Sequence, residues 1–182
     1  MRATMLLLLA SCAAGPVPSA PLVMIEDFES GRARWRDAGS GWKKTEVEIV
    51  DGGVGGRKAA RITFSGKGEG EAWSDLTWPV ERWPDGATHV VFWARAPKAC
   101  RLLLKANLGP THEDLEMWAT AVEITTEWRE IAVAVADLKE RIWAHRQSPA
   151  IEPARIIGIG FVELDFPVTF EVDRIGAGDG RK

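Results

Sequence analysis

Apolar and polar positions alternate along most of the chain in short runs, which is the period-two pattern of half-buried β-strands. The runs are rich in Val, Ile, Thr, Phe and Trp, and clusters of Gly, Pro and Asp separate them. This spacing predicts an all-β antiparallel sandwich of about ten strands. The strands are expected at 22–29, 45–50, 58–65, 71–78, 88–96, 100–108, 116–124, 128–135, 155–164 and 168–176.

Helix is expected in at most one place, over 136–144, where Leu138 and Ile142 stand at a helical spacing. The pattern allows about two turns of helix, and its flanks favour a loop insertion instead. The length of the chain needs only one core. We therefore predict a single sandwich over residues 22–178, followed by a short tail at 179–182.

The N-terminal pattern predicts an export signal. The apolar run 3–10 is too short to span a bilayer and has the length of a signal-peptide core. The run ends in Leu9-Ala10-Ser11-Cys12, which resembles the bacterial lipobox, in which the cysteine is acylated and becomes the new N-terminus. Ordinary cleavage nearby, for example after Ala13, is the alternative. We expect a lipoprotein-type signal peptide at 1–12 and a Pro-rich tether at 13–21.

These features predict a secreted protein of the bacterial cell envelope that touches the membrane through its lipid anchor only. If lipid modifies Cys12, Cys100 is left without a partner, so no intrachain disulfide is expected. Cys100 stands in a strand-like apolar run, where a buried, unreactive thiol is the expected state.

Charge and aromatic content narrow the choice of partner. Lys and Arg total 23 against 26 Asp and Glu, so there is no basic excess to neutralise phosphates and nucleic acid is not expected as a partner. The chain has nine Trp and no Tyr. Most of these rings are expected in the core, but some should face outward, where flat side chains recognise sugars or proteins.

Four segments resemble a known group of domains. They are Ile25-Glu26-Asp27-Phe28-Glu29, Val90-Val91-Phe92-Trp93-Ala94-Arg95-Ala96, Glu127-Trp128-Arg129-Glu130-Ile131, and the closing pair Ile157-Gly158-Ile159-Gly160-Phe161 and Phe170-Glu171-Val172-Asp173-Arg174-Ile175. The chain is similar in these segments to galactose-binding-like jelly rolls, especially carbohydrate-binding module family 11 and the complex I intermediate-associated proteins. Family 11 modules usually present tyrosines to glucan, and this chain has none.

The resemblance implies that one sheet, built from 71–78, 100–108, 116–124 and 155–164, is concave and binds the ligand. Strand alternation then selects the outward side chains, although a slip of one residue would reverse the face of 116–124. Gly158 and Gly160 would leave room above this sheet. The candidate ligand-binding residues are Trp73, Asp75, Arg101, Lys105, Asn107, Glu116 and Trp118, with Trp143 and His145 at the rim.

A sugar would suit these side chains, because its C–H face stacks on Trp and its hydroxyls need paired donors and acceptors. The alternative is that Arg101, Lys105 and Glu116 are only the solvated face of a sheet, paired across strands. The resemblance also suggests a structural calcium ion at Asp27, Glu29 and Asp173. Equally, these carboxylates could pair with Arg32, Arg34 or Arg174.

The function expected from the sequence is non-catalytic recognition of an oligo- or polysaccharide. The first alternative is an envelope assembly or docking sandwich that binds another protein. A glycoside hydrolase would need an acid and base drawn from Glu113, Asp114 and Glu116 on one side and Glu163 and Asp165 on the other. No nucleophile or metal motif supports catalysis, so we expect no enzyme.

Overall fold

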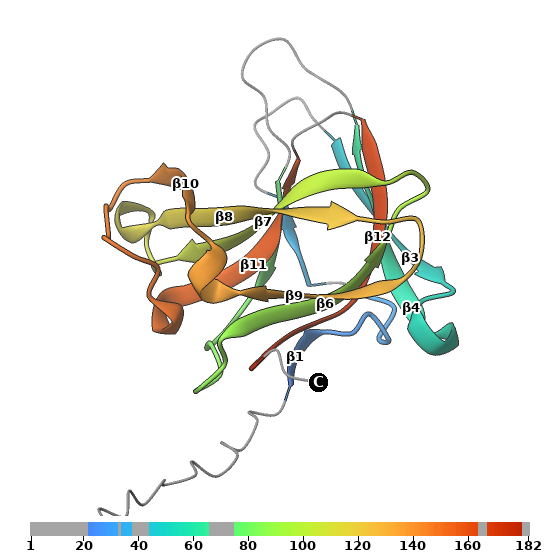
Figure 1. The fold of residues 1–182 in the computed structure, drawn as a ribbon, viewed down its shortest axis with the longest axis horizontal. Coiled ribbons are helices and arrows are strands. Elements are labelled where there is room, and N and C mark those ends of the chain that lie inside the picture. Colours follow the sequence, from blue (N-terminus) through green and yellow to red (C-terminus); the bar gives the residue numbers. More distant parts are fainter. Residues whose placement is uncertain (1–21, 33, 38–43, 66–74, 164–166, 180–182) are drawn as a thin grey trace, which may run out of the picture.

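The computed structural model describes residues 22–32, 34–37, 44–65, 75–163 and 167–179. In this part of the chain the only helices are four single 3₁₀ turns, and the other elements are β-strands in two sheets (Figure 1). Every strand pairing in both sheets is antiparallel. The all-β antiparallel sandwich predicted from the sequence is therefore confirmed.

Sheet A is organised around the last strand of the chain. Its order is β3 (Lys44–Asp51), β4 (Lys58–Ser65), β12 (Val168–Gly178), β6 (His89–Arg95) and β9 (Arg129–Ala134), and β1 (Val23–Glu26) also pairs with β12. One edge of β12 bonds β4 along its first half and β1 along its second, and the other edge bonds β6. The first and last strands of the chain are thus neighbours.

Sheet B holds the four segments expected to carry the ligand. Its order is β10 (Glu140–Ala144), β8 (Glu116–Ile124), β7 (Cys100–Leu108), β11 (Ile156–Glu163), β5 (Asp75–Pro79) and β2 (Arg36–Asp37). The segments 71–78, 100–108, 116–124 and 155–164 correspond to β5, β7, β8 and β11, although 71–74 and 164 lie outside the described residues. Their predicted grouping in one sheet is confirmed.

The segment 136–144 is where the secondary-structure prediction was wrong. All ten predicted strands are present, but Glu140–Ala144 is an additional strand, β10, which pairs with β8 as the edge of sheet B. Ile142 packs against an apolar cluster on the outer face of the sheet, whereas Leu138 is buried in the core. Pairing with β8 satisfies the backbone, so a weak helical spacing does not decide the conformation.

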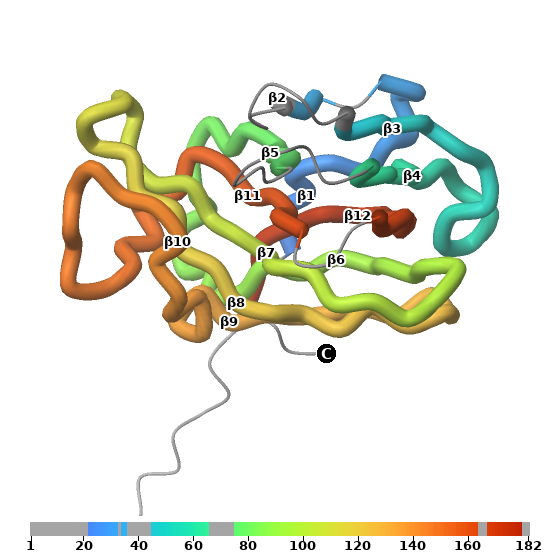
Figure 2. Tube along the Cα trace, turned by 90° about the horizontal axis from the view of Figure 1, so that it is seen from above, coloured from blue at the N-terminus to red at the C-terminus, as the bar shows by residue number. Residues whose placement is uncertain are grey.

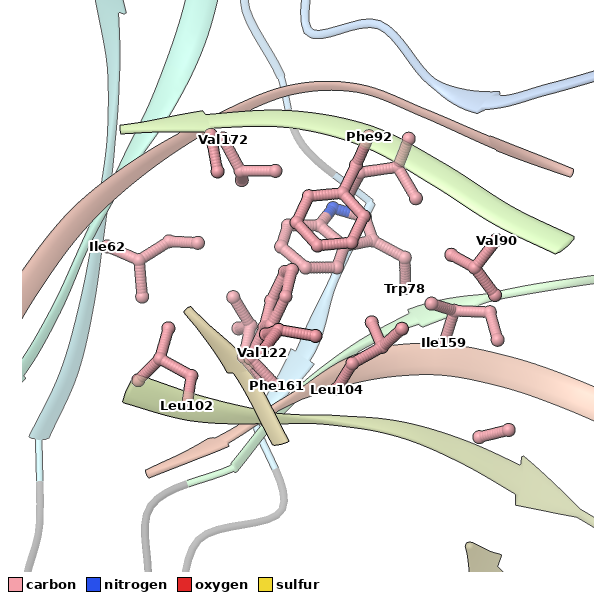
Figure 3. Packing of buried hydrophobic residues seen from close by; sticks show 14 of the residues in the cluster. Ile62, Trp78, Val90, Phe92, Leu102, Leu104, Val122, Ile159, Phe161 and Val172 are labelled. Atoms are coloured by element: carbon pink, nitrogen blue, oxygen red, sulfur yellow. The ribbon is translucent and has the colours of Figure 1, made fainter. Parts of the chain in front are cut away.

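The core fills the space between the two sheets. Strand alternation turns Phe92 of sheet A toward Trp78 and Phe161 of sheet B (Figure 3), and Phe170 of sheet A packs against Phe161. The Phe161 ring centre lies 5.2 Å from that of Phe170, 5.3 Å from that of Phe92 and 6.0 Å from that of Trp78. Burying each such ring stabilises the fold by about 1.5–3 kcal/mol, so these rings hold the two sheets together.

Strand β10 and the turns beside it occupy one end of the sandwich, and the β3–β4 turn occupies the opposite end (Figures 1 and 2). Within the described ranges, no helix is long and apolar enough to cross a membrane.

Candidate functional site on the outer face of sheet B

The outer faces of the two sheets differ in chemistry. On sheet A, Glu171 lies between Arg61 and Arg95, with ion-pair distances of 2.9 Å and 2.7 Å, and Arg95 also lies over the Trp128 ring. Cross-strand pairs of this kind satisfy one another. On sheet B, the outer face instead carries a small apolar cluster formed by Leu103, Ala119 and Val162. The apolar face of sheet B is therefore the candidate site.

A hollow of about 220 Å³ opens on this face between β7, β8, β10 and β11. Ala119 occupies the middle of β8, and its short side chain fills little of the space over the sheet. Trp143 of β10 is 37% exposed, whereas the other tryptophans of the described residues are buried or half-buried. The hollow is lined by Leu103, Met117, Ile142, Trp143 and Val162. It offers an apolar floor with one large aromatic side chain at its edge.

A polar network lies on the same face, toward β5. The Lys105 ammonium pairs with the Asp75 carboxylate, and both side chains are fully buried. The Thr77 hydroxyl donates to Asp75 Oδ1 at 3.1 Å, and Asn107 Nδ2 donates to Thr77 Oγ1 at 3.4 Å. Burial lowers the pKa of Lys105, and the Asp75 charge and hydrogen bond oppose that shift. Asn107 Oδ1 is itself buried and accepts no hydrogen bond within the described residues.

Three rings form a cluster at the rim. The His145 ring centre lies 4.3 Å from that of Trp143 and 4.2 Å from that of His112. His112 starts the 3₁₀ turn His112–Asp114 between β7 and β8, and His145 directly follows β10. His112 was not among the residues predicted for the site, because no sequence pattern links it to His145, 33 residues later.

Glu116 has a structural role that its position in the sequence did not reveal. Its carboxylate is buried and accepts hydrogen bonds from the Trp118 indole at 3.1 Å, from the backbone N–H and hydroxyl of Ser148, and from Arg155 at 3.1 Å. Burial alone would raise the pKa of Glu116, but these donors outweigh it and hold the pKa below its ordinary value. Glu116 thereby fastens the segment between β10 and β11 onto β8.

The outward face predicted for 116–124 was wrong. Trp118 is only 6% exposed and packs in the core with Val122, whereas Met117 and Ala119 face outward. Both faces of this strand are largely apolar, so alternation alone does not select one. The larger side chains fill the space between the sheets, and the guanidinium of Arg141 lies 4.7 Å from the Trp118 ring centre.

The other predicted ligand residues divide into two groups. Arg101 is exposed, and its Nε lies 3.6 Å from Glu123 Oε1 on the neighbouring strand. This ion pair fits the alternative interpretation, in which Arg101 belongs to a solvated face with charges paired across strands. Asp75, Lys105 and Asn107 do point outward, joined by Thr77, as predicted. Trp73 and Cys12 lie outside the described residues.

Gly158 and Gly160 do not open space over the sheet as expected. A Cβ atom at Gly160 would overlap the carbonyl oxygen of Leu76 and lie 2.9 Å from Thr77 Cα. A Cβ at Gly158 would lie 2.5 Å from Thr77 Cγ2. The glycines of β11 instead allow the backbone of β5 to approach closely, which is a common use of glycine within a strand.

The carboxylates proposed for calcium lie at the opposite end of the molecule from the ring cluster. Buried Asp173 accepts from the Val54 N–H at 2.9 Å, and its Oδ1 has no hydrogen-bond partner in the described chain. Burial raises the pKa of Asp173, and Glu29 adds to the shift. Asp27 Oδ1 instead accepts from the Glu29 N–H at 3.1 Å. No three His, Cys, Asp or Glu side chains of the described residues gather closely enough to hold a metal ion.

Most of the described carboxylates considered for hydrolysis are engaged or buried, and Glu113 is exposed on the His112–Asp114 turn. Asp114 lies 3.8 Å from Arg146, and its Oδ2 accepts from the Thr111 hydroxyl at 3.0 Å. Glu116 and Glu163 are buried, and Asp165 lies outside the described residues. Among the described residues, the structure therefore adds no accessible carboxylate opposite Glu113 and Asp114.

Comparison with known proteins identifies the fold. No protein-family model and no curated protein sequence matches the chain. Among solved structures, the family 11 carbohydrate-binding module of Clostridium thermocellum in complex with a β-1,3-1,4-mixed-linked tetrasaccharide is similar, with a TM-score of 0.70 and 17% identity over 86% of this chain and 94% of that one. A family 30 carbohydrate-binding module gives 0.59 at 12% identity, covering 81% and 89%. An exo-β-agarase gives 0.57 at 10% identity over 88% of this chain, but over only 25% of the enzyme.

At sequence identities of 10–17%, these similarities show a shared fold and nothing beyond it. The chain has the jelly-roll fold of family 11 carbohydrate-binding modules, as the resemblance implied. The likeness to complex I intermediate-associated proteins stays a prediction.

Proposed function

We propose that this protein is a non-catalytic carbohydrate-binding module that recognises an oligo- or polysaccharide on the outer face of sheet B. The observation that carries the proposal is the exposed Trp143 at the edge of an apolar hollow on that face. A pyranose ring can stack its C–H face on such an indole, while the rim imidazoles bond its hydroxyls. The likeness in fold to carbohydrate-binding modules supports this reading.

The ligand contacts differ from those expected from the sequence. Trp143 and His145 are retained as candidates to contact the sugar. Asp75 and Lys105 form a buried pair, and the side-chain oxygen of Asn107, the third predicted residue of that network, is buried too. Glu116 and Trp118 support the site from beneath the sheet. Trp73 stays a candidate from the sequence.

Titration with oligosaccharides tests the proposal. The first ligand is a β-1,3-1,4-mixed-linked tetrasaccharide, which the similar family 11 module binds, followed by other β-glucan and galactan oligosaccharides, with binding measured by calorimetry. Trp143→Ala is expected to weaken binding at least tenfold, which corresponds to about 1.4 kcal/mol. Trp128→Ala, on the sheet A side, should leave the affinity unchanged. Trp73→Ala tests the other tryptophan that the sequence analysis placed at the ligand.

Absence of binding across the sugars, from a folded sample, would overturn the proposal and favour an envelope docking protein. In that case a partner should co-purify with the wild type.

We further propose that Cys12 is lipidated and anchors the protein in the bacterial cell envelope. The support is the sequence Leu9-Ala10-Ser11-Cys12 after an apolar run. Labelled fatty acid should be incorporated by the wild type expressed in bacteria and not by Cys12→Ala. Labelling of both proteins, or of neither, would contradict the proposal.

A further inference from the structure

The ring cluster at the rim contains a pair of imidazoles whose geometry is unusual for solvent-exposed side chains. His112 Nε2 and His145 Nε2 lie 3.2 Å apart, while the ring centres are 4.2 Å apart. The two Nε2 atoms are therefore closer to each other than the ring centres are. Binding of one ion by both Nε2 atoms would require the ring centres to move apart. We propose that His112 and His145 together bind a divalent transition-metal ion such as Zn²⁺, Cu²⁺ or Ni²⁺. This proposal does not rest on the proposed sugar function, although the two sites share the rim imidazoles.

The separation of the two nitrogens fits a shared metal. Zinc bonds imidazole nitrogen at about 2.0–2.1 Å in tetrahedral geometry, which places two such nitrogens about 3.3–3.4 Å apart. Imidazole is a preferred ligand of zinc, copper and nickel. Binding needs both Nε2 atoms unprotonated, so each ring carries its proton on Nδ1. Both histidines are exposed, and water can accept a hydrogen bond from each Nδ1.

The backbone holds both histidines at this spacing. The Leu115 N–H donates to the His112 carbonyl at 3.3 Å, and the His145 N–H donates to the Leu115 carbonyl at 3.0 Å. The Thr111 hydroxyl also accepts from the Asp114 N–H, which caps the 3₁₀ turn that carries His112. The two Cα positions are thus linked through a short chain of backbone hydrogen bonds. Because the backbone is already ordered by these hydrogen bonds, metal binding needs to order only the two side chains.

The surroundings define the kind of site. Trp143 contacts both imidazoles and closes one side, with ring-centre distances of 4.3 Å to His145 and 5.8 Å to His112. Asp114, on the same turn, is paired with Arg146. No third side chain of the described residues completes a cluster of metal ligands. The protein therefore supplies two ligands, and water or a bound ligand supplies the others, so the ion exchanges readily.

Nuclear magnetic resonance of the imidazoles provides the test. The chain contains three histidines, so the full-length protein without a polyhistidine tag should give three Cε1–H correlations. Addition of Zn²⁺ is expected to shift the signals of His112 and His145 and not that of His89, which lies in sheet A beside Thr88. A chelator should restore the original spectrum.

Matched variants separate a metal site from a hydrogen-bonded pair. His112→Ala and His145→Ala should each weaken Zn²⁺ binding at least tenfold, the double variant should lose little more, and His89→Ala should bind as the wild type does. Cu²⁺ should quench part of the tryptophan emission, and Trp143→Phe should remove most of that quenching. Unshifted imidazole signals, or equal Zn²⁺ affinity in all the single variants, would overturn the proposal.

The outcome is separable from that of the sugar titration, because His112→Ala removes a metal ligand and leaves Trp143 in place. Sugar binding without zinc binding would overturn the metal site alone, and the reverse result would overturn the proposed function alone.

Discussion

At the scale of single residues, the buried charges of sheet B have partners, whereas some buried polar atoms of the described residues accept no hydrogen bond. Glu116 has four donors in its immediate surroundings, and Lys105 has Asp75. Asn107 Oδ1 and Asp173 Oδ1 are among the acceptors without a hydrogen bond in the described residues. Since a buried polar atom without a partner is costly, an ion bound at Asp173 would stabilise the protein.

Replacing Glu116 tests its role in fastening the β10–β11 segment. Glu116→Gln leaves Arg155, 17% exposed, without its buried counter-charge, and we expect a loss of roughly 2–4 kcal/mol of unfolding free energy. Urea unfolding followed by tryptophan fluorescence measures this loss. The control Glu123→Gln, in an exposed pair with Arg101, should cost less than about 1 kcal/mol. Equal losses in the two variants would refute the structural role.

The same variant should change the acid sensitivity of the fold. Because the folded-state pKa of Glu116 is lowered, its ionisation stabilises the protein above its unfolded pKa of about 4.3. That contribution is lost as the pH falls through the folded-state pKa. The wild type should therefore lose more stability than Glu116→Gln over this acidic range.

The ionisation of Asp173 should affect the stability of the fold with the opposite sign. Burial raises its pKa in the folded state, so ionisation above its unfolded pKa of about 3.9 costs stability. Without calcium, Asp173→Asn should be more stable relative to the wild type at pH 7 than at pH 3, as measured by thermal unfolding. A difference that does not change with pH would contradict this expectation.

The same pair of proteins tests the calcium proposal. If Asp27, Glu29, Asp173 and backbone carbonyls bind calcium, the ion should raise the Tm of the wild type at pH 7 and not that of Asp173→Asn. An equal effect of calcium on both proteins would exclude a role for Asp173 in binding it.

At the scale of elements, each strand of sheet B is set by what lies against it on both faces. Strand β8 turns its larger side chains inward because the space between the sheets accommodates them, which leaves Met117 and Ala119 on the outer face. Strand β10 adds Ile142 and Trp143 to that face. Strand β11 uses glycine where β5 approaches. The hollow thus results from four strands together and from no single sequence motif.

The approach of β5 to β11 gives a prediction about Gly160. In Gly160→Ala the new Cβ meets the backbone of Leu76, which cannot rotate away, so β5 must shift. We expect a loss of about 1–3 kcal/mol or more, measured by thermal unfolding with circular dichroism. In Gly158→Ala the nearest atom is the methyl group of Thr77, and the loss should be smaller. The reverse ranking would show that this strand contact is not rigid.

At the scale of the whole molecule, one core joins the two sheets, and β12 pairs with the first strand of the described residues. Phe161 of sheet B contacts Phe92 and Phe170 of sheet A, so neither sheet has a separate core. Strand β1 and strand β12 pair with each other in sheet A. Sheet A can therefore form fully only after β12 has been synthesised.

Unfolding should accordingly be one cooperative transition. Sheet content followed by far-ultraviolet circular dichroism and core packing followed by tryptophan fluorescence should have coincident midpoints in urea. Midpoints that separate clearly would show that one sheet survives without the other.

The local pattern of the sequence determined the all-β class, the ten main strands and the face of β7, because alternation and turn residues act over a few neighbours. The grouping of β5, β7, β8 and β11 in one sheet was implied by the resemblance to family 11 modules and not by the local pattern. Tertiary structure decided the face of β8, because both of its faces are apolar and only the volume between the sheets selects one. It also decided the strand at 140–144, the burial of Glu116 and the meeting of His112 with His145. These depend on contacts between segments far apart in the chain, which no local pattern of residues encodes.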